Sequence, residues 1–222
     1  MSILSVENLN LEIGPAKILE DVSFKLNEGR ILAITGESGS GKSMTALSII
    51  QLQPKNAKLG GKIFFRDQEI TNKNELELCK IRGAKIGMIF QEPMTALNPV
   101  KTVGDQISET IVLHSEKNKT SADSETFNIL ERVGLNPAIN VFKRYPHELS
   151  GGQRQRVVIG IAIALKPSII IADEPTTALD VTTQSQILAL LKKLVKEDNI
   201  SMILITHDLA VVANMADQIA VM

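Results

Sequence analysis

The chain has 222 residues, of which 44% are hydrophobic and 22% are charged, and its formal net charge is −1. That composition is typical of a globular protein with a sizeable core, and it excludes a chain that is disordered throughout. The near-zero net charge gives no indication of a nucleic-acid partner recognised through bulk electrostatics.

The chain carries no sign of secretion or of membrane insertion. Its single cysteine, Cys79, cannot form an internal disulfide, which fits a reducing cytosol. Residues 1–7 lack the basic and apolar regions of a signal peptide. The longest run of apolar residues and glycine, 157–165, is too short to span a bilayer. We therefore expect any membrane role to require a separate membrane partner.

The first 90 residues have the pattern of strands. Apolar residues from Ile3 to Leu26 alternate loosely with polar ones and are interrupted at Gly14–Pro15, which predicts two antiparallel strands joined by a turn. Residues 27–29 predict a second turn. The other elements predicted here are strands over 31–35, 62–66 and 85–90 and helices over 44–52 and 72–82.

From about residue 102 to residue 166 the pattern becomes helical. Polar residues 115–124 are predicted to separate two apolar-periodic segments, and Gly134–Pro137 to end one of them. Beyond this region strands alternate with helices, which indicates a mainly parallel α/β core. The predicted elements there are strands over 168–172, 202–206 and 218–222 and helices over 183–197 and 209–215.

A phosphate-binding loop stands between a predicted buried strand and a predicted helix. Its pattern is G-x-x-x-x-G-K-S, and its glycines let backbone N–H groups converge on phosphate oxygens, with the helix N-terminus adding partial positive charge. Lys42 can reach the β- and γ-phosphates, and the Ser43 hydroxyl can bind Mg²⁺. The alternative is a glycine-rich turn without a ligand. The predicted nucleotide-binding residues are Gly36, Glu37, Ser38, Gly39, Ser40, Gly41, Lys42, Ser43 and Met44.

Two carboxylates follow the apolar strand 168–172. A buried strand of an α/β protein delivers residues at its carboxyl end to the crevice where ligands bind. Asp173 suits Mg²⁺, bound directly or through water, and Glu174 is placed to activate an attacking water as general base. The alternative is a helix-capping pair before Pro175.

The stretch Leu149-Ser150-Gly151-Gly152-Gln153 precedes a helical run. Alone it could be a simple turn and helix cap. Together with the phosphate loop and the acidic pair, it resembles the ATP-binding cassette (ABC) family, whose signature motif is LSGGQ, and the resemblance covers nearly all of the chain. It implies a P-loop NTPase cassette with a mainly parallel core sheet, an N-terminal antiparallel β-subdomain and an inserted α-helical subdomain. The expected core is about 1–91 and 167–222, and the helical subdomain about 92–166.

The resemblance also implies roles for single residues. Two such cassettes pack head to tail, so Ser150, Gly151, Gly152 and Gln153 would bind the γ-phosphate of the partner's ATP. Gln91 would contact Mg²⁺ and the attacking water and couple to membrane subunits, and His207 would lie at the γ-phosphate. Asp180, in the segment 178–180, would cross the dimer interface. The implied cofactors are ATP and Mg²⁺, with Ser43, Gln91 and Asp173 as metal ligands.

One position departs from the family pattern. Many cassettes stack adenine on an aromatic residue before the phosphate loop, and counting back places Ile13 there. Only seven residues of the chain are aromatic, six Phe and one Tyr. We therefore expect phosphate contacts to dominate nucleotide binding and Ile13 to contribute only apolar contact to the base.

Three stretches narrow the resemblance to importers of di- and oligopeptides and of nickel. They are Gln91–Pro99, Arg144–Glu148 and Asp173–Val181. Those cassettes normally continue beyond the point where this sequence stops, so we expect a C-terminally truncated chain.

The leading hypothesis is thus an ATP-hydrolysing subunit of an importer, peripheral to the cytoplasmic face of the cell (inner) membrane. Its expected partners are a second cassette, identical or different, two transmembrane permease subunits and an extracytoplasmic substrate-binding protein. The alternative is a non-transport cassette ATPase acting on nucleic acid or ribosomes, but the spacing between Lys42 and Leu149 leaves no room for the long coiled coil of DNA-repair cassettes. A small-molecule phosphotransferase would not explain LSGGQ.

Overall fold

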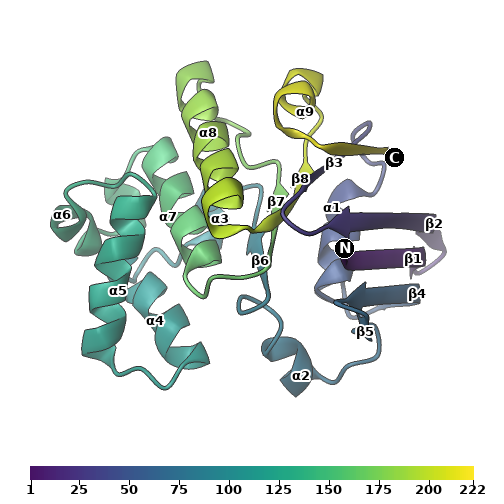
Figure 1. Ribbon diagram of the computed structural model, residues 1–222, viewed down its shortest axis with the longest axis horizontal. Helices are drawn as coiled ribbons and strands as arrows, with labels where there is room; N and C mark the ends of the chain where they lie inside the picture. Colours follow the sequence, from purple (N-terminus) through teal and green to yellow (C-terminus); the bar gives the residue numbers. More distant parts are fainter.

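Two β-sheets of different kinds organise the structure, a computed structural model that describes residues 1–222 (Figure 1). The antiparallel sheet has the strand order β2-β1-β4-β5, and the second sheet, which is parallel throughout, has the order β6-β7-β8-β3-β9. The strands are β1 (Ser2–Ile13), β2 (Ala16–Asn27), β3 (Ile31–Thr35), β4 (Ala57–Phe65), β5 (Gln68–Glu69), β6 (Ile86–Ile89), β7 (Ile169–Asp173), β8 (Ser201–Ile205) and β9 (Gln218–Val221). The predicted mixed α/β fold is confirmed.

Helices α4 to α7 gather on one side of the parallel sheet, at the left of Figure 1, and the antiparallel sheet lies on the other. No helix is both long enough and apolar enough to cross a membrane. The helices are α1 (Lys42–Ile49), α2 (Glu75–Cys79), α3 (Pro93–Ala96), α4 (Val103–His114), α5 (Lys119–Arg132), α6 (Ala138–Phe142), α7 (Gly151–Ile163), α8 (Val181–Asp198) and α9 (Leu209–Met215), with a 3₁₀ turn over Pro146–Glu148.

Several predicted boundaries were wrong. The helix predicted over 72–82 is only α2, whose first turn is fixed by a capping box between Asn74 and Glu77. Residues 119–124, predicted as part of a separator, form the first turns of α5, because the Asn118 side chain caps that helix by accepting a bond from Ser121 N. Strand β4 starts at Ala57, before Gly60–Gly61, because residues 57–60 pair with residues 10–13 of β1.

The parallel sheet lies between two apolar cores. Along β7 and β8 successive side chains point to opposite faces of the sheet, so alternate residues join opposite cores. One core joins the sheet to α4 to α8, and the other joins it to α1 and the antiparallel sheet. Because both faces are covered, these strands are apolar almost throughout, as parallel strands usually are. The first core takes Ile170, Ala172, Met202 and Leu204, and the second takes Ile169, Ile171, Ile203 and Ile205.

Helix α7 is held to the parallel sheet by a close backbone contact at Gly87 of β6. A Cβ placed on Gly87 would lie 2.5 Å from the carbonyl oxygen of Ala162 in α7. A backbone atom cannot move aside as the end of a side chain can, so this glycine sets how closely α7 approaches the sheet. The same helix begins at the predicted signature motif, and the contact therefore helps to position that motif.

We predict that Gly87→Ala lowers the free energy of unfolding by about 1–3 kcal/mol, because the added methyl overpacks this contact. Gly60→Ala is the matched control, since its Cβ would meet Asn10 Cβ at an ordinary 3.6 Å. Urea unfolding followed by circular dichroism measures both variants. Equal stability of the two variants would contradict the prediction.

Candidate functional site

Four loops meet at one edge of the parallel sheet. Strands β3, β6, β7 and β8 run in the same direction, so the residues that follow their carboxyl ends are brought together there. These are the phosphate loop after β3, Gln91 after β6, Asp173 and Glu174 at the end of β7, and His207 after β8. The predicted phosphate-loop, acidic, glutamine and histidine residues thus converge, although they come from distant parts of the sequence.

The phosphate loop is packed too closely at one point for any side chain. Gly41 has φ +95° and ends the loop at the N-terminus of α1. A Cβ there would lie 2.5 Å from Leu19 Cδ2 and 3.0 Å from the carbonyl oxygen of Ile18. Both the left-handed conformation and the proximity of β2 therefore require glycine at this position.

The Lys42 side chain lies back along the loop. Its Nζ donates hydrogen bonds to the carbonyl oxygens of Gly36 (3.0 Å) and Glu37 (2.7 Å), and the residue is only 7% exposed. The Ser40 hydroxyl is buried and has no hydrogen-bond partner in the chain. A buried cation over a turn of backbone N–H groups, beside an unpaired hydroxyl, fits an anionic ligand such as a phosphate.

Ser43 and Asp173 join the phosphate loop to β7. Ser43 Oγ donates a hydrogen bond to Asp173 Oδ1 over 3.0 Å. Burial raises the pKa of Asp173, and the nearby Glu174 carboxylate adds to that rise, while Ser43 and Lys42 oppose it. A hydroxyl and a carboxylate at this distance are ligands of the kind that Mg²⁺ prefers. The chain holds no cluster of three or more His, Cys, Asp or Glu residues that could bind a metal by themselves.

The Glu174 carboxylate is the centre of a second hydrogen-bond network. One of its oxygens lies 3.0 Å from His207 Nδ1, and the other accepts bonds from Gln91 Nε2 (3.1 Å) and Thr177 Oγ1 (2.9 Å). Burial raises the pKa of Glu174, but the hydrogen bonds with His207 and Thr177 outweigh it and hold the pKa below its ordinary value. Glu174 is therefore ionised at neutral pH, which is the form that a general base needs.

Lys42, Gln91, Glu174 and His207 face a common cavity of about 640 Å³. Its size and polar lining suit a nucleotide phosphate chain with an attacking water. Two residues of the site were not predicted. Thr177, which bonds Glu174, lies in the run 173–180 but carries no signal of its own. Leu209, which lines the cavity, is an apolar residue at an ordinary helix start. The lining residues are Thr35, Gly36, Glu37, Ser38, Lys42, Gln91, Glu174, His207, Leu209 and Val221.

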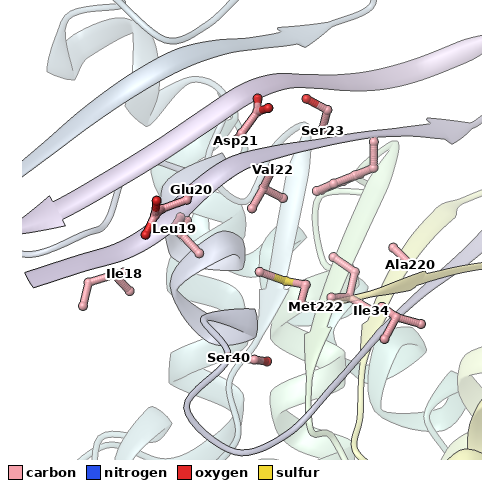
Figure 2. A pocket seen from close by; sticks show the side chains of 12 residues that line it. Ile18, Leu19, Glu20, Asp21, Val22, Ser23, Ile34, Ser40, Ala220 and Met222 are labelled. Atoms are coloured by element: carbon pink, nitrogen blue, oxygen red, sulfur yellow. The ribbon is translucent and has the colours of Figure 1, made fainter.

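A second cavity, of about 400 Å³, adjoins the phosphate loop between β2 and the end of β9. Figure 2 shows Val22, Met222 and Ser40 among the side chains that line it. Ile18 lines this cavity, whereas Ile13, at the hairpin end of β1, is half-buried and lines neither cavity. Ile18 was not predicted at this position, because counting back from the phosphate loop does not reveal which strand of the hairpin faces the loop.

The signature residues lie apart from both cavities and cap a helix. Ser150 Oγ accepts a bond from Gln153 N (3.3 Å), and Gln153 Oε1 accepts one from Ser150 N (3.0 Å), which together form a capping box at the start of α7. Gly151 and Gly152 occupy the turn between them. The helix-cap interpretation is thus correct within one chain, and it leaves the exposed outer side of the turn available to another molecule.

Asp180 has the corresponding position at the start of α8. Its carboxylate accepts bonds from Thr183 N (3.0 Å) and Thr183 Oγ1 (2.7 Å), and these bonds lower the pKa of Asp180. Asp180 likewise lines neither cavity. The structure therefore divides the predicted site residues into a phosphate-side group around Lys42 and Glu174 and a separate group formed by Ser150–Gln153 and Asp180.

Comparisons with known proteins agree on one family. The sequence profile of the ABC transporter family matches residues 19–177. The dipeptide transport ATP-binding protein DppD of Bacillus subtilis is 48% identical over 99% of this chain and 68% of its own length. The oligopeptide transport ATP-binding protein OppD of Escherichia coli is 46% identical over 100% of this chain and 67% of its own length.

Solved structures show the same fold. The dimeric structure of MJ0796, a bacterial ABC transporter cassette, superposes with a TM-score of 0.86 at 31% identity, covering 99% of this chain and 94% of that one. A dimeric post-hydrolysis state of the same cassette, bound to ADP and Pi, matches equally well. The convergent phosphate-side residues, the family profile and these neighbours together show that the chain belongs to the ABC transporter family, as an ATP-hydrolysing cassette.

Proposed function

We propose that this chain is the ATP-hydrolysing, energy-coupling subunit of a peptide importer. The observation that carries the proposal is the convergence of Lys42, Gln91, Glu174 and His207 on one cavity, within the fold of a transporter cassette. The relatives named as dipeptide and oligopeptide transport proteins support peptides over nickel as the substrate, as does the E. coli glutathione import protein GsiA, which is 47% identical. Nothing in these comparisons favours the alternative of an ATPase acting on nucleic acid or ribosomes.

In this proposal the phosphate chain of ATP lies along Gly36–Ser43. Backbone N–H groups of the loop and the N-terminus of α1 hold the β- and γ-phosphates, and Met44 extends this turn. Lys42 Nζ exchanges its bonds to Gly36 and Glu37 for phosphate oxygens, which have higher negative charge. Ser43, Asp173 and Gln91 would hold Mg²⁺, which neutralises charge on the β- and γ-phosphates when bound.

Hydrolysis then requires an activated water beside Glu174. The water oxygen forms a bond to the γ-phosphorus, the bond to the β–γ bridging oxygen breaks, and Glu174 accepts the proton. ADP and inorganic phosphate are the products. His207 and Gln91, which both contact Glu174, are placed to orient the water and the γ-phosphate.

The chain would act with partners. The dimeric neighbour supports a second cassette, so that Ser150, Gly151, Gly152 and Gln153 bind the partner's ATP and Asp180 crosses the interface. Two membrane permease subunits would hold the pair at the cytoplasmic side of the membrane, and an extracytoplasmic protein would deliver the substrate. Within the cassette we propose a core of about residues 1–91 and 167–222 and a helical subdomain of about 92–166.

The first prediction separates hydrolysis from binding. Glu174→Gln removes the base but keeps the size of the side chain, so we expect turnover to fall by about 10²- to 10⁴-fold while ATP still binds and traps a dimer. Phosphate release and size-exclusion chromatography with ATP measure the two effects. Lys42→Ala is the comparison, because it removes the charge beside the phosphates and should weaken ATP binding by about tenfold or more. Near-full turnover by Glu174→Gln would rule out its role as base.

The second prediction tests the shared site. If Ser150 serves the opposite chain's ATP, mixing Ser150→Arg chains with Lys42→Ala chains leaves one composite site intact. We expect the mixture to hydrolyse ATP faster than either variant alone. If the natural partner is a different cassette, one substitution is placed in each of the two chains. A mixture no more active than its components would contradict the proposed arrangement.

The third prediction concerns the base. Stacking of a base on an aromatic ring contributes roughly 1–3 kcal/mol, and an aliphatic side chain recovers only part of it. We therefore expect weak discrimination between ATP and GTP. Ile13 lines neither cavity in the isolated chain, so Ile13→Tyr should tighten ATP binding by about tenfold only if this position faces the base once ATP is bound. Titration of both nucleotides with Mg²⁺ measures this, and Ile18→Tyr is the comparison because Ile18 lines the cavity beside the loop. Strong ATP preference in the natural chain, unchanged in Ile13→Tyr, would show that the base is held elsewhere.

A further inference from the structure

The second glycine of the signature loop, defined here as Ser150–Gln153, faces a side chain of the same protein. A Cβ placed on Gly152 would lie 2.5 Å from Cγ2 of Thr183. Real Cβ contacts are not that short, so Gly152→Ala requires Thr183 or α7 to move. Gly152 lies in the first turn of α7 with ordinary helical φ, and its backbone conformation therefore does not require glycine.

Thr183 has little freedom to move. Its β-branched side chain has few rotamers, and its hydroxyl donates to Asp180 Oδ2 over 2.7 Å. Its backbone N–H donates to Asp180 Oδ1 over 3.0 Å, which fixes the first turn of α8. The methyl group that faces Gly152 is thus fixed by two hydrogen bonds from Thr183 to Asp180, and displacing it would break the cap of α8.

The neighbouring glycine differs. A Cβ on Gly151 would meet Leu179 Cδ2 at 3.5 Å, which is an ordinary van der Waals distance. The two glycines therefore contact successive parts of the same segment, Leu179 and Thr183, but only Gly152 is in a position without room for a side chain. This difference provides a matched pair of substitutions within one turn.

We propose that Thr183 is a positioning residue: fixed by Asp180, it packs against Gly152 and holds the signature loop and the segment Ala178–Asp180 together as one surface. The inference rests on the proposed function, in which both segments act on a second cassette. The inference adds that one chain presents the signature loop and the segment Ala178–Asp180 as a unit, so that a displacement of the signature loop is transmitted to Asp180.

This unit is also connected to Glu174. Asp180 is six residues from Glu174 in the sequence, and Thr177, which lies between them, donates a hydrogen bond to the Glu174 carboxylate. The contact therefore connects the surface that meets the partner with the general base of the same chain.

The test is a rescue experiment in four variants. Gly152→Ala should lower the apparent Tm by roughly 2–8 °C and reduce ATP turnover by about 10- to 100-fold, because the new methyl displaces Thr183. Adding Thr183→Ser removes Cγ2 but keeps the hydroxyl that binds Asp180, so this double variant should recover most of both losses. Adding Thr183→Val instead keeps a methyl group at the contact and should give no recovery. Gly151→Ala, the matched control, should not lower Tm.

Hydrogen exchange of backbone amides shows whether the two segments act as a unit. We expect Gly152→Ala to increase exchange in residues 178–184 as well as in 149–155, and Thr183→Ser to reverse the increase in both. The proposal is overturned if exchange changes only in 149–155, or if Thr183→Ser restores Tm but not turnover, which would leave a purely structural contact. The Tm and hydrogen-exchange measurements need neither ATP nor a partner. If they give the expected results while the natural chain does not hydrolyse ATP, the proposed function is contradicted and the Gly152–Thr183 contact is not.

Discussion

The parallel direction of β3, β6, β7 and β8 is the constraint on which the rest of the structure depends. It places four loop starts at one sheet edge, and the Ser43–Asp173 hydrogen bond joins two of them directly. Both faces of these strands are covered by apolar cores, so their register is strongly fixed, since a slip of one residue would exchange the two cores. A rigid edge of this kind can hold polar groups at catalytic distances although they come from separate loops.

Lys42 and Glu174, two charged residues of the phosphate-side cavity, already have partners within the chain. Lys42 is bonded to two carbonyl oxygens, and Glu174 to three side chains. An incoming phosphate therefore competes with existing contacts and does not meet isolated charges, which would be costly to keep partly buried. We infer that nucleotide binding rearranges this network, because Lys42, Gln91 and His207 can all gain stronger partners in a triphosphate and its metal ion.

The second group of site residues, formed by Ser150–Gln153 and Asp180, is organised by helix capping. Each of these residues satisfies backbone N–H groups at the start of a helix, and the two helix starts pack together through Gly152 and Thr183. Capping fixes the local backbone while it leaves the outer surface of both turns exposed. A single chain thus carries a largely pre-formed phosphate-side cavity and, apart from it, a pre-formed surface for another molecule.

The sequence by itself determined most of the strands, though not β5 or the start of β4, together with the phosphate loop and the acidic pair at Asp173 and Glu174, because short apolar runs and glycine-rich turns are local signals. It placed α9 at its observed bounds, Leu209–Met215, but misjudged α2 and the start of α5, where capping side chains decide the boundary. Only the tertiary structure decided that Ile18 and not Ile13 lines a cavity beside the loop, that Thr177 bonds Glu174 and that Thr183 packs on Gly152. Those contacts depend on how strands and helices pack across the chain, which no local pattern encodes.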